Sequence, residues 1–205
     1  GSAEQNIIKW RDKGGYDFFS ITDHNYATDI IEKDGIINLG KALEDTKKEQ
    51  HLVVLNLPAD YIYVDMGSQM ATLSPYYQSL GAYVVYAHPM WEGALQSDDQ
   101  IKCAGFSNFV EVYTNTIESS RAFDIMLSKG YKVFCLGVDD YHYNESFKDS
   151  FFNTAWVVAF ARNKDKASIW DALLTGASYA STGAQISNIT LSKEGVIEVT
   201  CPKPS

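Results

Sequence analysis

Short apolar runs alternate with more polar stretches along most of the chain. The runs read as buried strands at residues 16–22, 51–57, 82–89, 109–113, 131–138 and 154–160. The stretches between them have helical character at residues 3–13, 67–80, 118–129 and 166–175, and several of these end at a glycine. This alternation is typical of βαβ units with a largely parallel sheet, so we expect an α/β barrel or a doubly wound sheet.

The last part of the chain has a different pattern. Residues 178–182 read as another short strand, which ends in a tight turn. Residues 186–192 and 196–201 then flank a turn marked by Gly195, which predicts an antiparallel β-hairpin at the C-terminus. Since no internal repeat, linker or low-complexity tract interrupts the sequence, residues 1–205 are predicted to form a single domain.

The chain is acidic, with a formal net charge of -9. This charge argues against broad electrostatic binding to nucleic acid or to an anionic membrane, because both would be repelled. A small anionic substrate could still bind where metal ions reverse the local sign of the charge. We therefore expect a small-molecule substrate, and the oligomeric state stays open.

Cysteine spacing and hydropathy narrow the class of protein further. Cys103, Cys135 and Cys201 lie far apart, which predicts neither a zinc finger nor a disulfide framework. No run reaches the roughly 18 apolar residues that cross a bilayer, and no signal peptide is recognisable. We expect a soluble chain, either cytoplasmic or secreted after removal of a signal.

Three of the four histidines directly follow apolar runs. His24, His88 and His142 stand at the ends of such runs, whereas His51 opens one. Because the carboxyl ends of parallel strands meet at one edge of a sheet, the first three histidines are predicted to converge.

Asp140 and His142 are two positions apart, so in an extended chain both side chains point the same way. A carboxylate and an imidazole aimed at one point suit zinc, manganese or iron. Each motif alone also has an ordinary structural interpretation, as an acidic loop at Asp140, a turn at Asp23 or a core histidine at His88. The recurrence of histidine at three strand ends favours a metal site. The sequence has no nucleophile elbow, P-loop or Rossmann fingerprint.

Five segments, in order, resemble the motifs of PHP (polymerase and histidinol phosphatase) metallohydrolases. They are GYDFFSITDHN, VVYAHPMW, FVEVYT, CLGVDDYH and SYASTG, within residues 4–202. The match is closest to the CehA/McbA-like branch. The resemblance implies a distorted (β/α)7-type barrel.

The resemblance also implies a set of site residues. His24, His88, Asp140 and His142 occupy the positions of metal ligands, and Glu44 takes that of a bridging glutamate. The Pro-Gly that usually precedes this glutamate is absent, so Glu32 and Glu49 are rivals for its role. His51 and Asp23 are the implied catalytic residues, with Asp23 orienting an imidazole.

One family element is missing from the sequence. PHP proteins begin with a strand that carries His-x-His-Thr, and these 205 residues contain no such motif. We therefore expect a PHP-like domain that lacks its first strand and is truncated at both ends.

The implied function is hydrolysis of a phosphate ester by water activated on two or three divalent ions of zinc, manganese or iron. Two alternatives stay open. One is hydrolysis of a carbamate or similar carbonyl ester, as in the CehA-like relatives. The other is a non-catalytic PHP-like binding module that has lost its metals.

Overall fold

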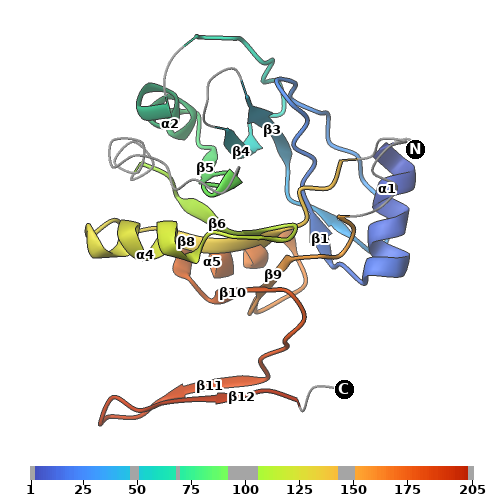
Figure 1. Ribbon diagram of the computed structural model, residues 1–205. Helices are drawn as coiled ribbons and strands as arrows, with labels where there is room; N and C mark the ends of the chain where they lie inside the picture. The colour runs from blue at the N-terminus through green and yellow to red at the C-terminus, as the bar shows by residue number, and fades with distance from the viewer. Residues whose placement is uncertain (1–2, 47–50, 68–69, 92–105, 143–150, 203–205) are drawn as a thin grey trace.

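The computed structural model describes residues 3–46, 51–67, 70–91, 106–142 and 151–202 of a mixed α/β protein (Figure 1). Its centre is a six-stranded sheet in which β3, β4, β5, β6 and β7 are neighbours in that order and β8 also pairs with β6. The strands are β3 (Lys41–Asp45), β4 (Leu52–Leu57), β5 (Tyr83–Tyr86), β6 (Phe109–Thr114), β7 (Ile117–Glu118) and β8 (Phe134–Val138).

Strand direction in this sheet changes at β4. β4 runs antiparallel to both β3 and β5, whereas β5, β6 and β8 are parallel to one another. Leu52, at the start of β4, pairs with Asp45 at the end of β3 and with Tyr86 at the end of β5. One edge of the sheet therefore collects the start of β4 together with the ends of β3, β5, β6 and β8.

Both faces of the sheet are covered, which explains why its strands read as near-continuous apolar runs. Leu52 and Val54 of β4 pack on the face covered by α2 (Met70–Ser79) and α4 (Ser120–Ser128). Val53 and Leu55 point to the other face, against α5 (Lys166–Thr175).

The N-terminal segment forms a separate layer. α1 (Ala3–Lys9) continues as a π-helical turn, η1 (Trp10–Gly14), which ends at Gly15 in the left-handed conformation. A two-stranded parallel sheet of β1 (Phe18–Phe19) and β2 (Ile37–Asn38) follows. A third apolar cluster of Ile7, Phe19 and Ile36 joins this layer.

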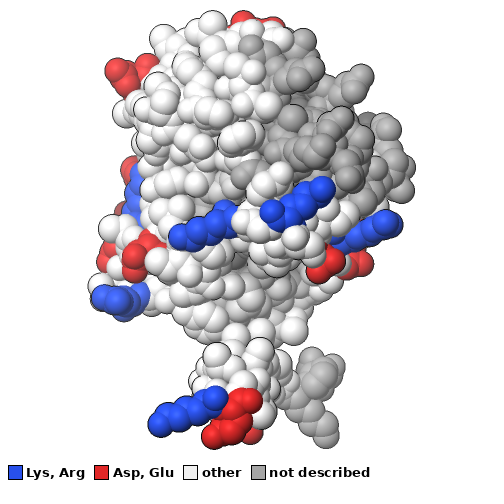
Figure 2. Space-filling model, turned by 90° about the vertical axis from the view of Figure 1, so that its left-hand side faces the viewer, with Lys and Arg blue, Asp and Glu red and all other residues white. Residues whose placement is uncertain are grey.

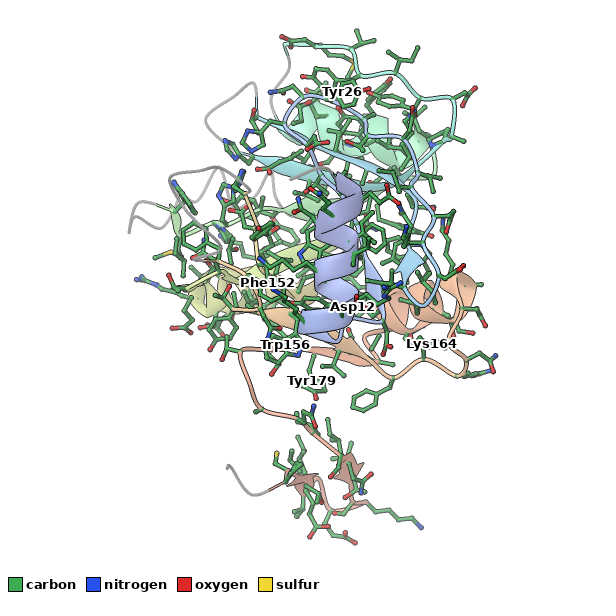
Figure 3. The ribbon with its side chains drawn as sticks, turned by 90° about the vertical axis from the view of Figure 1, so that its right-hand side faces the viewer. Asp12, Tyr26, Phe152, Trp156, Lys164 and Tyr179 are labelled. Atoms are coloured by element: carbon green, nitrogen blue, oxygen red, sulfur yellow. The ribbon has the colours of Figure 1, made fainter. Side chains whose placement is uncertain are left out.

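Two strands lie beside β8. β9 (Trp156–Ala159) and β10 (Ser178–Ser181) pair antiparallel. A Cβ at Gly137 would come within 2.6 Å of the Trp156 carbonyl oxygen, so the close approach of β9 to β8 requires glycine there. Figure 3 shows α1 on this side of the molecule, where Lys9 Nζ lies 4.2 Å from the centre of the Phe152 ring.

The last two strands, β11 (Asn188–Leu191) and β12 (Ile197–Thr200), form a hairpin that projects from the body (Figure 1). All eight of these residues are exposed. The cross-strand pairs Ile189–Val199 and Leu191–Ile197 share one face, and the polar pairs lie on the other. The hairpin thus presents an apolar face to solvent.

The surface carries charges of both signs. Figure 2 shows side chains of both signs on one face of the molecule, with several Lys and Arg side chains across its middle, and the hairpin as a narrow projection below. Among the described residues, no helix is long and apolar enough to span a membrane.

The structure corrects part of the expected fold. The predicted hairpin and the helix at 166–175 are present. The sheet, however, is mixed rather than largely parallel, and the pairing of the described strands does not close into a barrel. β3 was not anticipated because its buried stretch contains Lys41, Glu44 and Asp45 and so lacks an apolar pattern.

Candidate metal centre

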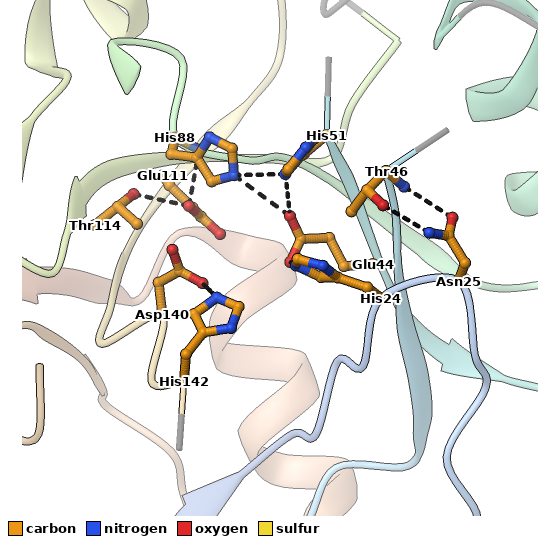
Figure 4. Close-up of polar contacts among 10 residues, drawn as sticks. All are labelled: His24, Asn25, Glu44, Thr46, His51, His88, Glu111, Thr114, Asp140 and His142. Carbon is orange, nitrogen blue, oxygen red and sulfur yellow. Dashed lines mark hydrogen bonds and ion pairs between the residues drawn. The ribbon is translucent and has the colours of Figure 1, made fainter. Parts of the chain in front are cut away.

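Glu44 is the centre of a cluster of histidines at the edge of the sheet (Figure 4). It lies in β3 with 3% of its surface exposed. Its Oε1 is 2.6 Å from His51 Nδ1 and 3.3 Å from His88 Nε2, and its Oε2 is 3.4 Å from His24 Nε2. One buried carboxylate therefore contacts three imidazoles from three separate segments of the chain.

Backbone pairing places His24 beside Glu44. The Glu44 N–H donates to the Asp23 carbonyl at 3.0 Å, and the Asn25 N–H donates to the Glu44 carbonyl at 2.8 Å. These bonds form a parallel bridge between His24 and Glu44, although β1 itself ends earlier. The chain beyond β1 is thereby held against β3.

The reversed direction of β4 brings in His51. This residue immediately precedes β4, at the sheet edge where β5 ends and His88 follows. His51 Nδ1 and His88 Nε2 are 3.0 Å apart. The expected position of His51 near His88 agrees with this distance, and its catalytic role stays a prediction.

Asp140 and His142 form a second pair next to the first group. Asp140 Oδ1 lies 3.0 Å from His142 Nε2, and the His142 and His24 ring centroids are 5.2 Å apart. Asp140 and His88 both have positive φ angles, 47° and 25°, in a region that residues other than glycine rarely adopt. Unusual backbone conformations at both residues fit a functional site.

The charges in the cluster stabilise one another. Burial alone would raise the pKa of Glu44, but hydrogen bonds and charge interactions with His51 and His88 outweigh it and lower that pKa to about 2. Burial opposes the protonated form of His88, yet Glu44, Glu111 and Asp140 raise its pKa above the ordinary value. The hydrogen bond to Asp140 likewise raises the pKa of His142.

Glu111 belongs to the same site and was not anticipated from the sequence. This β6 residue is 4% exposed, and its Oε2 accepts hydrogen bonds from the His88 N–H and the Thr114 hydroxyl, both at 2.8 Å. Burial raises its pKa to about 7. The available signal was a single charged residue within an apolar run, FVEVY.

The other predicted residues are less closely tied to the cluster. The Asp23 carboxylate accepts a hydrogen bond from the Thr28 hydroxyl, and its role in orienting an imidazole stays a prediction. Of the rivals to Glu44, Glu32 is exposed on the surface, and Glu49 lies outside the described residues. Asp139 accepts hydrogen bonds from Tyr16 and from three backbone N–H groups at residues 153–155, which fixes the chain just before Asp140.

A cavity of about 890 Å³ opens from the cluster into the molecule. His24, Glu44, His88, Glu111, Asp140 and His142 line its polar end. Its remaining walls are largely apolar and come from the α5-facing side of the sheet, from β9 and from α1. The site is therefore open to a small molecule.

The donor set fits a divalent cation. One nitrogen of His24, one oxygen of Glu44 and one nitrogen of His51 lie within 4.8 Å of one another. Imidazole nitrogens and carboxylate oxygens are ligands of zinc, manganese and iron. Bringing them together in a partly buried site is costly unless they share protons or a cation.

Comparisons with known proteins bear on the fold. Scans of protein-family models and of curated protein sequences found no match. Among solved structures, a protein from Bacteroides vulgatus superposes with a TM-score of 0.64 over 91% of this chain, at 16% identity. It is described as a two-domain protein containing a predicted PHP-like metal-dependent phosphoesterase, and this chain spans 66% of its length.

The chain shares its overall fold with this Bacteroides structure. PsfC from Pseudomonas syringae is a second similar structure, with a TM-score of 0.61, 13% identity, and coverage of 88% of this chain and 83% of PsfC. At these identities the likeness concerns the arrangement of the backbone. A place in the CehA/McbA-like branch is not confirmed.

Proposed function

We propose that this protein is a metal-dependent hydrolase, most simply a phosphoesterase, that uses a metal-activated water. The observation that carries the proposal is the buried Glu44 carboxylate, which lies within 3.4 Å of nitrogens from His24, His51 and His88. The PHP-like fold supports it, because the similar Bacteroides protein is described as containing a PHP-like metal-dependent phosphoesterase.

The proposed ligands are His24, Glu44, His51, His88, Asp140 and His142. Bound divalent cations would supply a water of lowered pKa and positive charge toward an anionic substrate. Glu44 is positioned to be shared between cations, since its two oxygens face different imidazoles. Asp140 and His142, from the end of β8, offer a further ligand pair. We propose that the site holds two or three cations.

The surrounding residues position these groups and the substrate. Burial of Glu44 and His88 keeps bulk water from competing for their donor atoms. The more exposed His24 and His142, whose side chains are each 46% exposed, border the open side through which a substrate would enter. The scissile ester is proposed to lie between them and Glu44.

Metal content is the primary test. The protein, purified without chelator and incubated with Mn²⁺, Zn²⁺ or Fe²⁺, is expected to retain metal after desalting, as measured by inductively coupled plasma mass spectrometry. Glu44→Gln should lose most of it, because a neutral amide is a poor ligand. Glu32→Gln is the matched control, since Glu32 is an exposed glutamate. Equal metal in wild type and Glu44→Gln would contradict the proposal.

Activity separates the substrate classes. The metal-loaded protein is assayed with a phosphate monoester, a phosphodiester and an aryl carbamate. Hydrolysis of either phosphate ester that depends on Glu44 supports the proposal. Carbamate cleavage alone would indicate the CehA-type reaction instead. Metal-dependent binding of substrate analogues without turnover, in protein that carries a complete ligand set, would indicate a binding module.

A further inference from the structure

The carboxylate of Glu111 is buried between the ends of two neighbouring strands. It lies in β6, lines the cavity, and is 4% exposed. Figure 4 shows the side chain between His88 and Asp140. A carboxylate in such a position needs hydrogen-bond donors to offset its loss of water.

Among the described residues, His88 and Thr114 donate hydrogen bonds to the Glu111 carboxylate, and both bonds reach the same oxygen. Oε2 accepts one from the backbone N–H of His88, at 2.8 Å, and one from the Thr114 hydroxyl, also at 2.8 Å. Thr114 lies three residues further along β6, whereas His88 follows the adjacent strand β5. Glu111 thus links the strand end that carries a proposed ligand to the next strand of the sheet.

The bond to His88 acts at a point where the backbone is unusual. His88 has a φ of 25°, which side-chain-bearing residues adopt only when the surroundings enforce it. An N–H bonded to a carboxylate is held more strongly than one bonded to a neutral acceptor. The direction of the His88 imidazole toward Glu44, 3.3 Å away, depends on this backbone.

We infer that Glu111 is a positioning residue of the metal centre, which sets the place of the His88 imidazole through the His88 backbone N–H. This inference rests on the proposed function, because it assigns a second layer of support to one of its ligands. It predicts that the effect of Glu111 on metal affinity passes through His88.

The test compares three substitutions by competition titration with Mn²⁺ and Zn²⁺. Glu111→Gln keeps an acceptor oxygen in place and should hold affinity within about threefold, whereas Glu111→Ala should weaken it about 10- to 100-fold. Glu111→Asp keeps the charge but shortens the side chain, so its metal affinity should fall between those of the other two variants. This variant replaces Glu111→Ala in the test if the alanine protein does not fold. Thr114→Val is the control, because it removes the donor that does not belong to a ligand.

A double-mutant cycle with His88→Ala tests whether Glu111 affects metal affinity through His88. In the His88→Ala protein, Glu111→Asp and Glu111→Ala should change metal affinity by less than about twofold. A loss as large as in the wild type would overturn the inference, since it would mean that Glu111 acts independently of His88. A tenfold or greater loss in Glu111→Gln would also overturn it and indicate direct ligation.

The backbone N–H of His88 gives a readout besides affinity. Its proton chemical shift is measured in metal-free protein labelled with ¹⁵N, at a pH well above 7 where the Glu111 carboxylate is ionised. The shift should move upfield in Glu111→Gln and Glu111→Asp as the charge-assisted bond weakens. Affinity and shift both unchanged in Glu111→Asp would refute the positioning role while leaving the proposed function standing. Failure of the wild type to bind metal would instead refute both.

Discussion

At the scale of single residues, the site depends on how charge is balanced in a place with little water. Glu44 keeps its charge although it is almost fully buried, because imidazoles approach both of its oxygens. Removing one member of such a group leaves the others without a partner, which costs more than the pair contributes. For site residues that lie outside the apolar core, we expect a substitution to reduce metal affinity more than it reduces the free energy of unfolding.

The pair at the end of β8 provides the first prediction. Asp140→Ala combined with His142→Ala is expected to remove most of the bound metal while far-UV circular dichroism stays unchanged. Both residues lie beyond the strand, and the His142 side chain is 46% exposed. The Tm of the metal-free protein should stay within about 5 °C of wild type. Asp139 is left intact because it holds residues 153–155. Unchanged metal content in the double variant would remove this pair from the ligand set.

The second prediction concerns pH. The pKa values of His88 and His142 are raised in the metal-free protein, so their protons stabilise the folded chain at low pH and are lost as pH rises through those values. The pKa of Glu44 is lowered, so its ionised form stabilises the folded chain at every pH above the ordinary pKa of a glutamate. This stabilisation is lost as pH falls toward about 2. Glu111, with its pKa raised to about 7, acts in the same direction as the histidines.

Stability of the metal-free protein should therefore fall between pH 6 and pH 8, whereas metal affinity should rise, because a cation must displace those protons. Chemical denaturation in chelator and Zn²⁺ titration at the two pH values measure the opposing trends. We expect affinity at least about tenfold higher at pH 8. A flat profile would mean that these imidazoles do not bind the metal.

Part of this site could be predicted from sequence alone. His24, His88 and His142 follow apolar strands, and the structure gathers them at one edge of the molecule. Glu44 was reached only through a family resemblance, and Glu111 was missed. Their placement depends on which strands are neighbours and in which direction these run, and local sequence does not encode either.

At the scale of elements, a strand whose buried positions include charged residues is not identified by the pattern of apolar residues. All five residues of β3 are buried, but three of them are Lys41, Glu44 and Asp45. Lys41 reaches Asp29 and a backbone carbonyl, and Asp45 accepts hydrogen bonds from Tyr63 and Tyr77. These partners come from distant parts of the chain, so the local sequence resembles a polar loop.

The projecting hairpin provides the third prediction. A two-stranded hairpin that buries little surface is marginally stable, so amide hydrogens of β11 and β12 should exchange far faster than those of β4 and β6. Replacing the cross-strand pair by Leu191→Lys and Ile197→Glu should reduce light scattering at high protein concentration and leave metal content unchanged.

Thr190→Lys is the control, because it adds a charge on the opposite face of the hairpin. It should scatter nearly as much as the wild type. Equal scattering by all three proteins would mean that the apolar face does not drive association.

At the scale of the whole molecule, the cavity has the size of a small-molecule site. It measures about 890 Å³, and pockets that bind small molecules are about 300–1,000 Å³. Among the described strands, β1 pairs only with β2 and β8 pairs only with β6, although β9 and β10 lie beside β8. Ala3 and Asn6 of α1 line the same cavity.

The fourth prediction follows from this space. We expect that a strand carrying His-x-His, the family motif that these 205 residues lack, would fill part of the cavity and add imidazole ligands to the metal site. A version carrying such a strand of about thirty residues at its N-terminus should bind more metal per chain and turn over substrate faster than the 205-residue chain. It should also have a higher Tm. Equal metal content and turnover in the two forms would show that the four histidines and their carboxylate partners suffice.

The overall architecture was foreseen only in outline. Periodicity identified most helices and strands, but the expected parallel arrangement failed at β4, which runs antiparallel to both β3 and β5. An apolar strand looks the same in either direction, so only its spatial neighbours decide the type of sheet.

The convergence of distant segments at Glu44 also has a kinetic consequence. The proposed ligands come from separate segments between residues 24 and 142, so the complete set exists only after the long-range contacts have formed. A cation that requires the complete set binds late on the folding pathway and has little effect on the rate of folding. The stabilisation by metal would appear instead as slower unfolding, so bound metal would lengthen the lifetime of the folded protein.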